Sequence, residues 1–448
     1  MKRLLKNAKV VNVFTEQIEE SNVLIDGEII AGLGKYYSDE DADVVEDLSG
    51  KYICPGFVDG HIHIESTMMT PWGLANACLP KGTTSVVTDP HEIANVCGVD
   101  GIKYMLQASE GLPLNVYVML PSCVPATPFD ESGAILFAED LDELYSSARV
   151  LGLAEMMNYP GIIYDDPATV KKVSECINKG KNVDGHAPLL SGRELDKYIA
   201  TGIQSDHECS NIDEAMERIS KGQWVMIREG SAAKNLDGLA GLIDGPSYAR
   251  CLLVTDDRNP MDIINEGHID NIVRKAIKLG KDPIRMIKMA SLNAATCFGI
   301  KRLGAIAPGY RADILVLNDI NSIDIKDVYS NGEKVVDNKS IIEFKEPEVD
   351  AYLKDIVTNS FHLDRLKDDD LVIEPKGNKC RVIKVIEGQI LTDEIIEEID
   401  FSVNNGIDVS KDILKLAVIE RHKNTGHKGL GYIKGIGLKR SACSFSIT

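Results

Sequence analysis

The chain has 448 residues, 44% of them hydrophobic, and its 69 acidic against 49 basic residues give a formal net charge of −20. This length suffices for more than one domain, whereas the acidic balance argues against binding to DNA, RNA or an anionic membrane. No apolar run approaches the roughly 20 residues that span a bilayer, and the basic N-terminus lacks the apolar core of a signal peptide. The ten cysteines include no C-x-x-C pair, so we expect a reducing cytoplasm and neither a disulfide framework nor a cysteine-built zinc site.

Two segments, residues 1–52 and 302–345, carry short alternating apolar patterns that predict β-strands. Turn signals occur in the first segment at Asp26-Gly27 and at Ser49-Gly50. Because the two segments bracket a long middle region, we expect them to pair into one small composite β-sandwich domain beside a central domain.

Between residues 53 and 301, short apolar strands alternate with helical stretches. Eight strand–helix units over about 250 residues match the size of a (β/α)8 barrel of the TIM type. A doubly wound open sheet is the alternative. The predicted strands are ICPGFVDGHI, TSVVTD, NVYVML, VLGLAE, NVDGH, GIQSD, QWVMIRE and CLLVTD.

Past residue 346 the composition shifts to the charged stretches KEPEVDAYLKD and HLDRLKDDD, which predict a connection or an exposed helix. Strand-like segments follow, KCRVIKVIEG and LKLAVIERHKNTGHKGLGYIKGIGLKR, and the chain ends at SACSFSIT. The glycines resemble those of a phosphate loop, but no Gly-Lys-Ser/Thr follows them, so hairpin turns are expected. We therefore expect a partial C-terminal α+β domain over residues 346–448.

Ionisable side chains concentrate at the C-terminal ends of the predicted barrel strands, where such barrels place their catalytic groups. His61 and His63 are alternate residues of one strand, so both imidazoles can face one cation. A lone histidine such as His268 or His362 is more often structural. The set as a whole, however, predicts a site for two divalent cations with Glu155 bridging them. The predicted ligands are His61, His63, Glu155, His186, His207 and Asp256.

Several longer motifs follow one another along the chain: PGFVDGHIHIES, TDPHEIANVCG, MLPSCVPATP, EMMNYPG, VDGHAP, SDHE, MIREGSAAKN and LVTDDRNP. In these motifs the sequence resembles the amidohydrolase superfamily and, within it, the bacterial adenine deaminases. The resemblance extends from the N-terminus to about residue 440. It implies a hydrolase of purine salvage that converts free adenine and water into hypoxanthine and ammonia. It also implies a cytoplasmic protein that forms a homo-oligomer.

The resemblance further implies two metal ions, Mn²⁺ or Fe²⁺, that hold a bridging hydroxide at neutral pH for attack on C6 of the purine. Asp256 would accept the proton of this hydroxide and return it to the departing amine, first as general base and then as general acid. Many members of the superfamily bridge their metals with a carboxylated lysine. Here Glu155 would take that place and also pass a proton toward ring N1.

Other residues at the strand ends are expected to act around the metals. Asp206 and Asp257 flank predicted ligands and would orient these ligands without binding the metals themselves. Between the neighbours Asp256 and Asp257, we assign the ligand role to Asp256, since the superfamily's ligand usually comes directly off the strand. The residues expected to contact the purine are His91, Glu92, Arg228 and Ser231.

The sequence departs from the family at its C-terminal end, because relatives continue beyond a segment that matches GLKRSAC. We expect a truncated C-terminal domain, which leaves open whether the chain is active. Two alternatives to adenine deamination remain. One is a different amidohydrolase, such as a cyclic amidase or another purine deaminase, and the other is a truncated, non-catalytic metal-binding remnant. The cytidine-deaminase type is disfavoured because H-x-E with P-C-x-x-C is absent.

Overall fold

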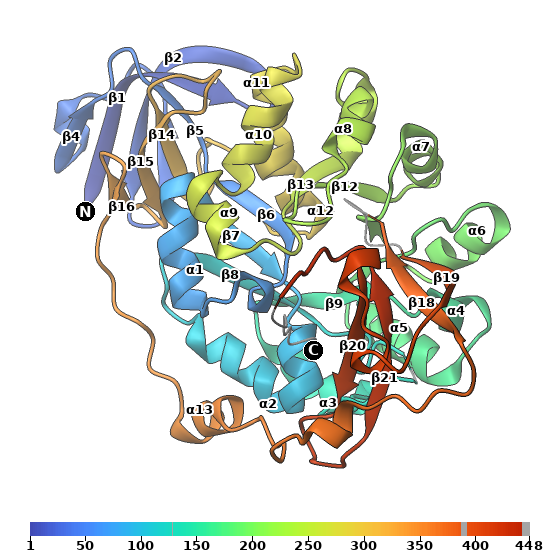
Figure 1. Cartoon of the computed structure of the whole chain (residues 1–448). Coiled ribbons are helices and arrows are strands. Elements are labelled where there is room, and N and C mark those ends of the chain that lie inside the picture. The colour runs from blue at the N-terminus through green and yellow to red at the C-terminus, as the bar shows by residue number, and fades with distance from the viewer. Residues whose placement is uncertain (128, 387–391, 441–448) are drawn as a thin grey trace.

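The computed structural model describes residues 1–127, 129–386 and 392–440, so the terminal stretch SACSFSIT lies outside the described residues. Figure 1 shows a mixed sheet around the N-terminus, a central set of parallel strands with surrounding helices, and a small C-terminal sheet. Among the described residues, no helix has both the length and the apolar character needed to cross a membrane.

The two β-rich flanking segments share one nine-stranded sheet. Strand β14 pairs antiparallel with β5, which brings Ile314 opposite Pro55 and joins the segments. The order is β17-β16-β15-β14-β5-β1-β2-β3, with β4 also beside β1. The sheet includes residues up to Pro55, three positions beyond the predicted boundary at residue 52. The strands are β1 (Lys2–Asn12), β2 (Gln17–Asp26), β3 (Ile29–Leu33), β4 (Val44–Asp47), β5 (Tyr52–Pro55), β14 (Ile314–Leu317), β15 (Ile325–Ser330), β16 (Glu333–Asp337) and β17 (Ser340–Ile341).

The central strands form the predicted barrel. Five of them pair in the order β10-β9-β8-β7-β6 and three in the order β11-β12-β13, and the pairs within both groups are parallel. Backbone hydrogen bonds connect the groups, from Gln204 N to Val183 O (3.0 Å) and from Asp256 N to His61 O (2.9 Å). The strands are β6 (Phe57–Ile62), β7 (Thr83–Thr88), β8 (Asn115–Leu120), β9 (Val150–Met156), β10 (Asn182–Gly185), β11 (Ser205–Asp206), β12 (Trp224–Arg228) and β13 (Cys251–Val254).

The predicted strand ICPGFVDGHI is in fact two strands, because the chain leaves the mixed sheet after β5 and enters the barrel at β6. Gly56 lies at the division. A Cβ atom there would come within 2.3 Å of the Thr84 hydroxyl oxygen, so the close approach of the chain to β7 requires glycine.

Helices connect the barrel strands, and Figure 1 shows them around the barrel. Several begin at a side chain that accepts a backbone N–H: Thr70 caps α1, Asp166 caps α5 and Asn211 caps α7. The helices are α1 (Pro71–Cys78), α2 (His91–Ala108), α3 (Ala138–Leu141), α4 (Tyr159–Ile163), α5 (Pro167–Asn178), α6 (Gly192–Ala200), α7 (Ile212–Ser220), α8 (Leu236–Leu239), α9 (Pro260–Asn265), α10 (Ile269–Lys278), α11 (Pro283–Lys288), α12 (Ala294–Cys297) and α13 (Ala351–Thr358).

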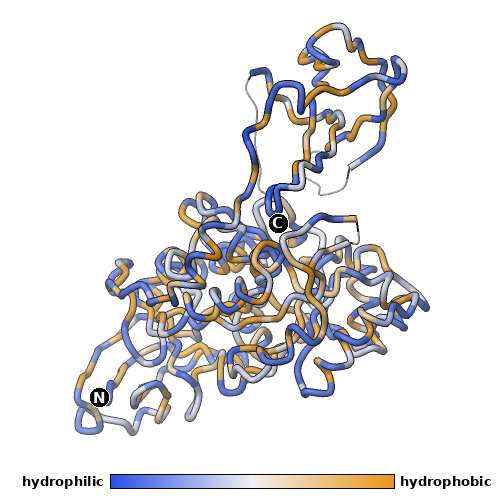
Figure 2. Tube along the Cα trace, turned by 90° about the horizontal axis from the view of Figure 1, so that it is seen from below, coloured by the Kyte–Doolittle hydropathy of each residue, from blue (hydrophilic) through white to orange (hydrophobic). Residues whose placement is uncertain are grey.

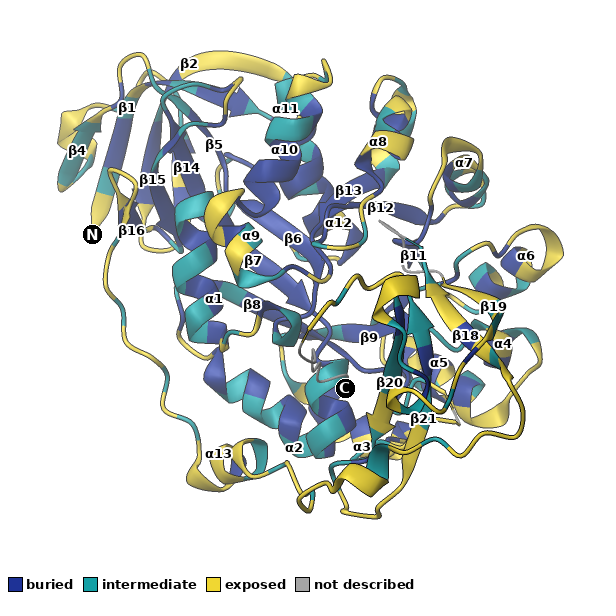
Figure 3. Ribbon diagram, in the orientation of Figure 1, coloured by how far each residue is buried: buried dark blue, intermediate teal, exposed yellow. Residues whose placement is uncertain are grey.

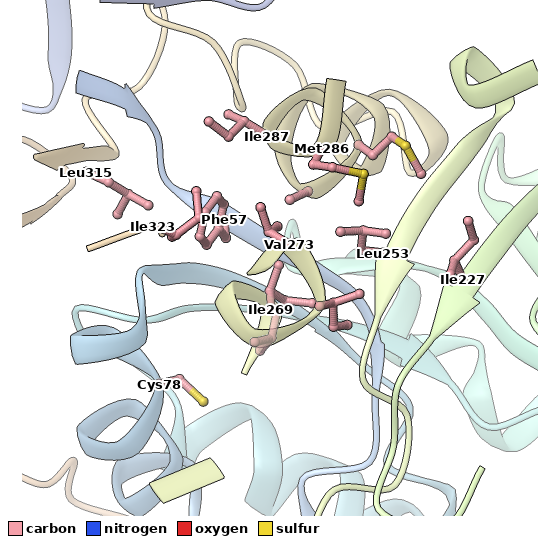
Figure 4. Close-up of a cluster of buried hydrophobic side chains, with 14 of the residues drawn as sticks. Phe57, Cys78, Ile227, Leu253, Ile269, Val273, Met286, Ile287, Leu315 and Ile323 are labelled. Carbon is pink, nitrogen blue, oxygen red and sulfur yellow. The ribbon is translucent and has the colours of Figure 1, made fainter. Parts of the chain in front are cut away.

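The core lies on both faces of the barrel strands, which Figure 3 shows as buried along most of their length. Phe57 of β6 belongs to the cluster outside the barrel, where side chains from β12, β13, α10 and α11 also converge (Figure 4). The next residue, Val58, belongs to a different cluster with Val87, Met226 and Leu252. This alternation, with both faces packed, explains why strands such as β8 (NVYVML) and β13 (CLLV) have nearly continuous apolar sequences.

The C-terminal sheet has a much smaller core. It consists of β18 (Lys379–Val385), β19 (Thr392–Glu398), β20 (Ile413–Ile419) and β21 (Lys428–Lys434), in the order β19-β18-β21-β20. Its cluster of buried apolar residues is Val382, Ile399, Ile413 and Tyr432. Figure 2 shows a lobe projecting from the body of the molecule. The one α-helix described past residue 346, α13, contacts α2 of the barrel.

Three of the glycines near this sheet lie in turns, as expected, whereas Gly429 and Gly431 lie within β21. Gly426 (φ 75°) lies between β20 and β21. Gly435 and Gly437, also at positive φ, each donate a backbone N–H to the carboxylate of Asp412 at 2.8 Å. With their donors used in this way, these glycines act as turn residues and not as a phosphate cradle.

The turn after β20 supports a prediction on stability. Glu420 accepts backbone N–H groups of His422 (2.6 Å), Lys423 (2.8 Å) and Thr425 (3.0 Å). Burial opposes its ionisation, but these hydrogen bonds lower the pKa of Glu420 from 4.5 to about 2. We expect Glu420→Gln to lower the free energy of unfolding of the C-terminal sheet by about 1–3 kcal/mol at pH 7. Because the folded-state pKa is depressed, this stabilisation is present above pH 4.5 and is lost as the pH falls toward 2.

Urea unfolding followed at pH 7 and pH 3 measures this effect. Glu398→Gln, at an exposed position of β19, is the control. An equal loss for Glu420→Gln at both pH values would contradict the assignment to an ionised carboxylate.

Candidate metal centre

The six predicted ligands all lie at the carboxyl ends of barrel strands. His61 is in β6 and Glu155 in β9, while His186 follows β10, His207 follows β11 and Asp256 follows β13. His63 comes directly after β6 in the chain. Ligand atoms of all six fall into groups in which every atom lies within 4.8 Å of the others. The barrel thus brings together side chains that are up to 195 positions apart, from His61 to Asp256.

One part of the site is formed by β6, β9 and β13. His63 Nε2 lies 3.3 Å from Asp256 Oδ1 and 3.4 Å from Glu155 Oε1. The other ring nitrogen of His63 donates to the backbone oxygen of Asp89 (3.0 Å), which orients Nε2 toward the carboxylates. His61 Nε2 lies 3.8 Å from Asp256 Oδ1.

The other part is formed by β9, β10 and β11. Glu155 Oε2 lies 2.8 Å from His186 Nδ1 and 3.1 Å from His207 Nε2. The two carboxylate oxygens of Glu155 therefore face different histidines. Oε1 contacts His63, whereas Oε2 contacts His186 and His207. A carboxylate that offers one oxygen to each of two groups of imidazoles has the arrangement needed to bridge two cations.

The donor set fits divalent transition metals, which bind imidazole and carboxylate groups in combination. His61 is 2% exposed, and its Nε2 has no hydrogen-bond partner among the described residues. A buried ring nitrogen without a partner is costly unless a ligand satisfies it. We propose that a bound cation satisfies this atom.

The charges of the site also favour cations. Burial opposes the ionisation of Glu155, but the charges and hydrogen bonds of His186 and His207 hold the pKa of Glu155 well below 4.5. Burial likewise disfavours charged His207, yet its contact with Glu155 raises the pKa of His207 to about 9. The carboxylates are therefore ionised and attract positive charge, which protons on the histidines or bound metal ions can supply.

Asp256 has a strained backbone. Its φ is 57°, in the left-handed region that a residue with a Cβ seldom adopts. Burial opposes ionisation of its side chain, but the hydrogen bond with His63 and the neighbouring imidazoles hold the pKa of Asp256 far below its ordinary value. The side chain also accepts a hydrogen bond from Arg228 Nη1 at 2.7 Å. This combination of strain and multiple contacts is typical of a functional position.

Two of the residues expected to contact the purine lie against this cluster. His91 Nδ1 is 3.0 Å from Asp89 Oδ2 and 3.5 Å from Glu155 Oε1. Arg228 donates to Asp256 and Glu208, while its Nε has no partner among the described residues. Both side chains are therefore placed to meet a ligand beside the predicted metal ligands.

The other two are engaged with neighbouring loops. Glu92 accepts a hydrogen bond from the Ser66 hydroxyl at 2.6 Å. Ser231 bonds to Asp262 (2.5 Å) and to the backbone N–H of Asn259 (2.9 Å), which connects it to the start of α9. The hydroxyl of Ser231 therefore has both a donor and an acceptor partner at the start of α9.

The flanking aspartates differ in their surroundings. Asp206 accepts the backbone N–H groups of Ala187 (3.0 Å) and Glu208 (2.7 Å), so it connects the residues that follow His186 and His207. Asp257 Oδ1 lies 2.5 Å from the Ser66 hydroxyl oxygen, and so shares the hydrogen of this hydroxyl with Glu92.

Sequence reasoning missed two acidic residues of the site, Asp89 and Glu208. Each forms part of a group that could hold a metal, Asp89 with His63 and His91, and Glu208 with His186 and His207. Both stand at strand ends, in the motifs TDPHE and SDHE. The criterion that selected the other ligands, an ionisable residue at the end of a barrel strand, could therefore have found Asp89 and Glu208 as well.

Sequence comparison identifies the family. The model of the amidohydrolase family matches residues 52–335, and that of the adenine deaminase C-terminal domain matches residues 389–448. Adenine deaminase from Clostridium acetobutylicum is 44% identical over 450 residues, which cover 99% of this chain and 77% of the relative. Adenine deaminase 2 from Carboxydothermus hydrogenoformans is 45% identical over 447 residues, with coverages of 99% and 76%.

Solved structures agree on the fold. A β-aspartyl dipeptidase from Fervidobacterium islandicum has a TM-score of 0.59 at 17% identity, covering 77% of this chain and 100% of the other. A dihydropyrimidinase from Brevibacillus agri has a TM-score of 0.59 at 16% identity, with coverages of 76% and 96%. Because the family model covers residues 52–335 and relatives of 44–45% identity match 99% of this chain, the chain belongs to the amidohydrolase family, in the group of the curated adenine deaminases.

Proposed function

We propose that this chain catalyses the hydrolysis of adenine to hypoxanthine and ammonia. The observation that carries the proposal is the similarity to curated adenine deaminases over 99% of the chain. The cluster of imidazoles and carboxylates supplies the chemistry that such a hydrolysis needs. The substrate is a free purine base, and the acidic surface argues against a nucleic acid polymer.

The proposed cofactor is a pair of Mn²⁺ or Fe²⁺ ions. The residues that would hold them are His61, His63, Glu155, His186, His207 and Asp256. When bound, such ions lower the pKa of water toward 7 and so make a nucleophile available at neutral pH. Glu155 would serve both ions, because its two oxygens face different histidines.

Proton transfer is assigned to the two carboxylates. Asp256 Oδ1 would accept the proton of the attacking water and then donate it to the amine that leaves C6, so that ammonia departs neutral. Glu155 would accept the second proton of the water and pass it to ring N1, so that the two protons of one water molecule end on N1 and on the departing ammonia.

The purine would be bound by residues around this centre. We retain His91, Glu92, Arg228 and Ser231 as its contacts, and Arg228 Nε, which has no partner among the described residues, is a donor that a purine nitrogen could satisfy. Asp206 and Asp257 would orient the adjacent ligands. A homo-oligomer in the cytoplasm completes the proposal.

Ammonia release from adenine is the direct test. The full chain is purified, reconstituted anaerobically with Mn²⁺ or Fe²⁺, and assayed for ammonia release on adenine, guanine and adenosine and for ring opening, which releases no ammonia, on dihydrouracil. We expect turnover on adenine alone. Turnover only on dihydrouracil or guanine would reassign the substrate, and metal binding without turnover on any of them would indicate a non-catalytic protein.

A further inference from the structure

The predicted base Asp256 uses its two oxygens differently. Oδ1 faces the histidines, 3.3 Å from His63 Nε2, whereas Oδ2 accepts a hydrogen bond from Arg228 Nη1 at 2.7 Å. An arginine paired with one carboxylate usually engages both oxygens through its fork of two N–H groups. If Arg228 did so here, Oδ1 would be withdrawn from the histidines.

Glu208 occupies that fork. Its Oε1 accepts from Arg228 Nη1 at 2.5 Å, and its Oε2 accepts from Arg228 Nη2 at 3.0 Å. The Nη1 group has two hydrogens, so one bonds Glu208 and one remains for Asp256. The bidentate pair is thus between Arg228 and Glu208, and Asp256 receives a single hydrogen bond.

All three side chains are buried, with exposures of 4% for Glu208 and 9% each for Arg228 and Asp256. They come from three adjacent parts of the barrel: Glu208 follows β11, Arg228 ends β12 and Asp256 follows β13. Neighbouring contacts constrain Glu208, since its backbone N–H bonds Asp206 at 2.7 Å. At such burial, competition between two carboxylates for one guanidinium decides how each is oriented.

We propose that Glu208 is a positioning residue which, by occupying the fork of Arg228, keeps Asp256 Oδ1 free to act at the metal centre. This inference rests on the proposed function for its catalytic consequence. The orientation of Asp256 also affects metal binding, which is measured without substrate.

A double-mutant cycle of Glu208→Gln and Arg228→Gln tests the proposal. In Glu208→Gln the fork is released and can take both oxygens of Asp256. We expect the affinity for Mn²⁺ and kcat at saturating Mn²⁺ each to fall by about 10- to 100-fold. In the double variant no guanidinium is present to withdraw Asp256, so the affinity for Mn²⁺, which is measured without substrate, should recover in part above that of Glu208→Gln.

The matched control is Glu46→Gln, which breaks a similar carboxylate–arginine contact, Arg3 Nη1 to Glu46 Oε1 at 2.5 Å, in the mixed sheet. It should leave Mn²⁺ affinity and kcat unchanged. Mn²⁺ affinity is measured by titration and kcat by ammonia release.

Glu208 lies 3.4 Å from His207 Nε2, so it is also a candidate ligand. In that case the double variant would bind Mn²⁺ no better than Glu208→Gln, and this result would overturn the positioning role. A wild-type chain that binds Mn²⁺ but leaves adenine unchanged would refute the proposed function, whereas the recovery of Mn²⁺ affinity in the double variant would still support the positioning role.

Discussion

Asp256→Asn is expected to lower kcat for adenine hydrolysis by about 10²- to 10⁴-fold, the usual contribution of a general acid–base group. Asparagine is nearly isosteric and retains one oxygen that can bond Arg228, but it cannot accept and return a proton. The loss should therefore lie in kcat, with a smaller change in KM. Steady-state kinetics of ammonia release, with the metal content of each preparation measured, checks this prediction.

Asp313→Asn provides the matched control. Asp313 is also buried, but it lies in the mixed sheet, where it accepts the backbone N–H of Asn331 at 2.7 Å. This variant should keep the wild-type kcat. If Asp256→Asn retained kcat within about threefold while holding its metal, the assignment of Asp256 as base would be wrong.

The double substitution His61→Ala/His63→Ala is expected to abolish both metal binding and activity. It removes two ligands from β6, including the buried His61 Nε2 that has no other partner among the described residues. Loss of the metals costs several kcal/mol of transition-state stabilisation, or about 10³-fold or more in rate. Metal analysis and ammonia release measured on the same sample test both consequences.

A variant that removes two exposed histidines instead, His362→Ala/His427→Ala, controls for non-specific loss of metal-binding groups. It should keep both the metal content and the activity. Wild-type activity in His61→Ala/His63→Ala would exclude these histidines as ligands.

Several features of the fold could be predicted because they depend on local pattern. The eight barrel strands were expected from short runs, and the clearest of these, such as NVYVML and CLLVTD, are rich in apolar residues because such strands are packed on both faces. The first run was only partly correct, because β5 and β6 share one continuous apolar pattern. The change of sheet at Gly56 depends on the contact with Thr84, which lies 28 positions away.

The candidate site was predictable to a similar extent. Ionisable residues directly after barrel strands were expected to converge, and the structure places His61, Glu155 and Asp256 together. Their roles as ligands stay predictions. The pairing of Arg228 with Glu208 was not foreseen, because the sequence spacing of 20 residues does not indicate contact between neighbouring barrel strands.

The sequence by itself determined the family, the barrel and the strand-end residues from which a metal centre could be built, because hydrophobic pattern and motif are properties of the chain order. Only the tertiary structure decided how the acidic groups share their partners. The two oxygens of Glu155 face different histidines, Asp257 turns to Ser66, and Glu208 competes with Asp256 for Arg228. Such choices depend on distances of a few ångströms between side chains of different strands, and these distances are set by how the barrel closes.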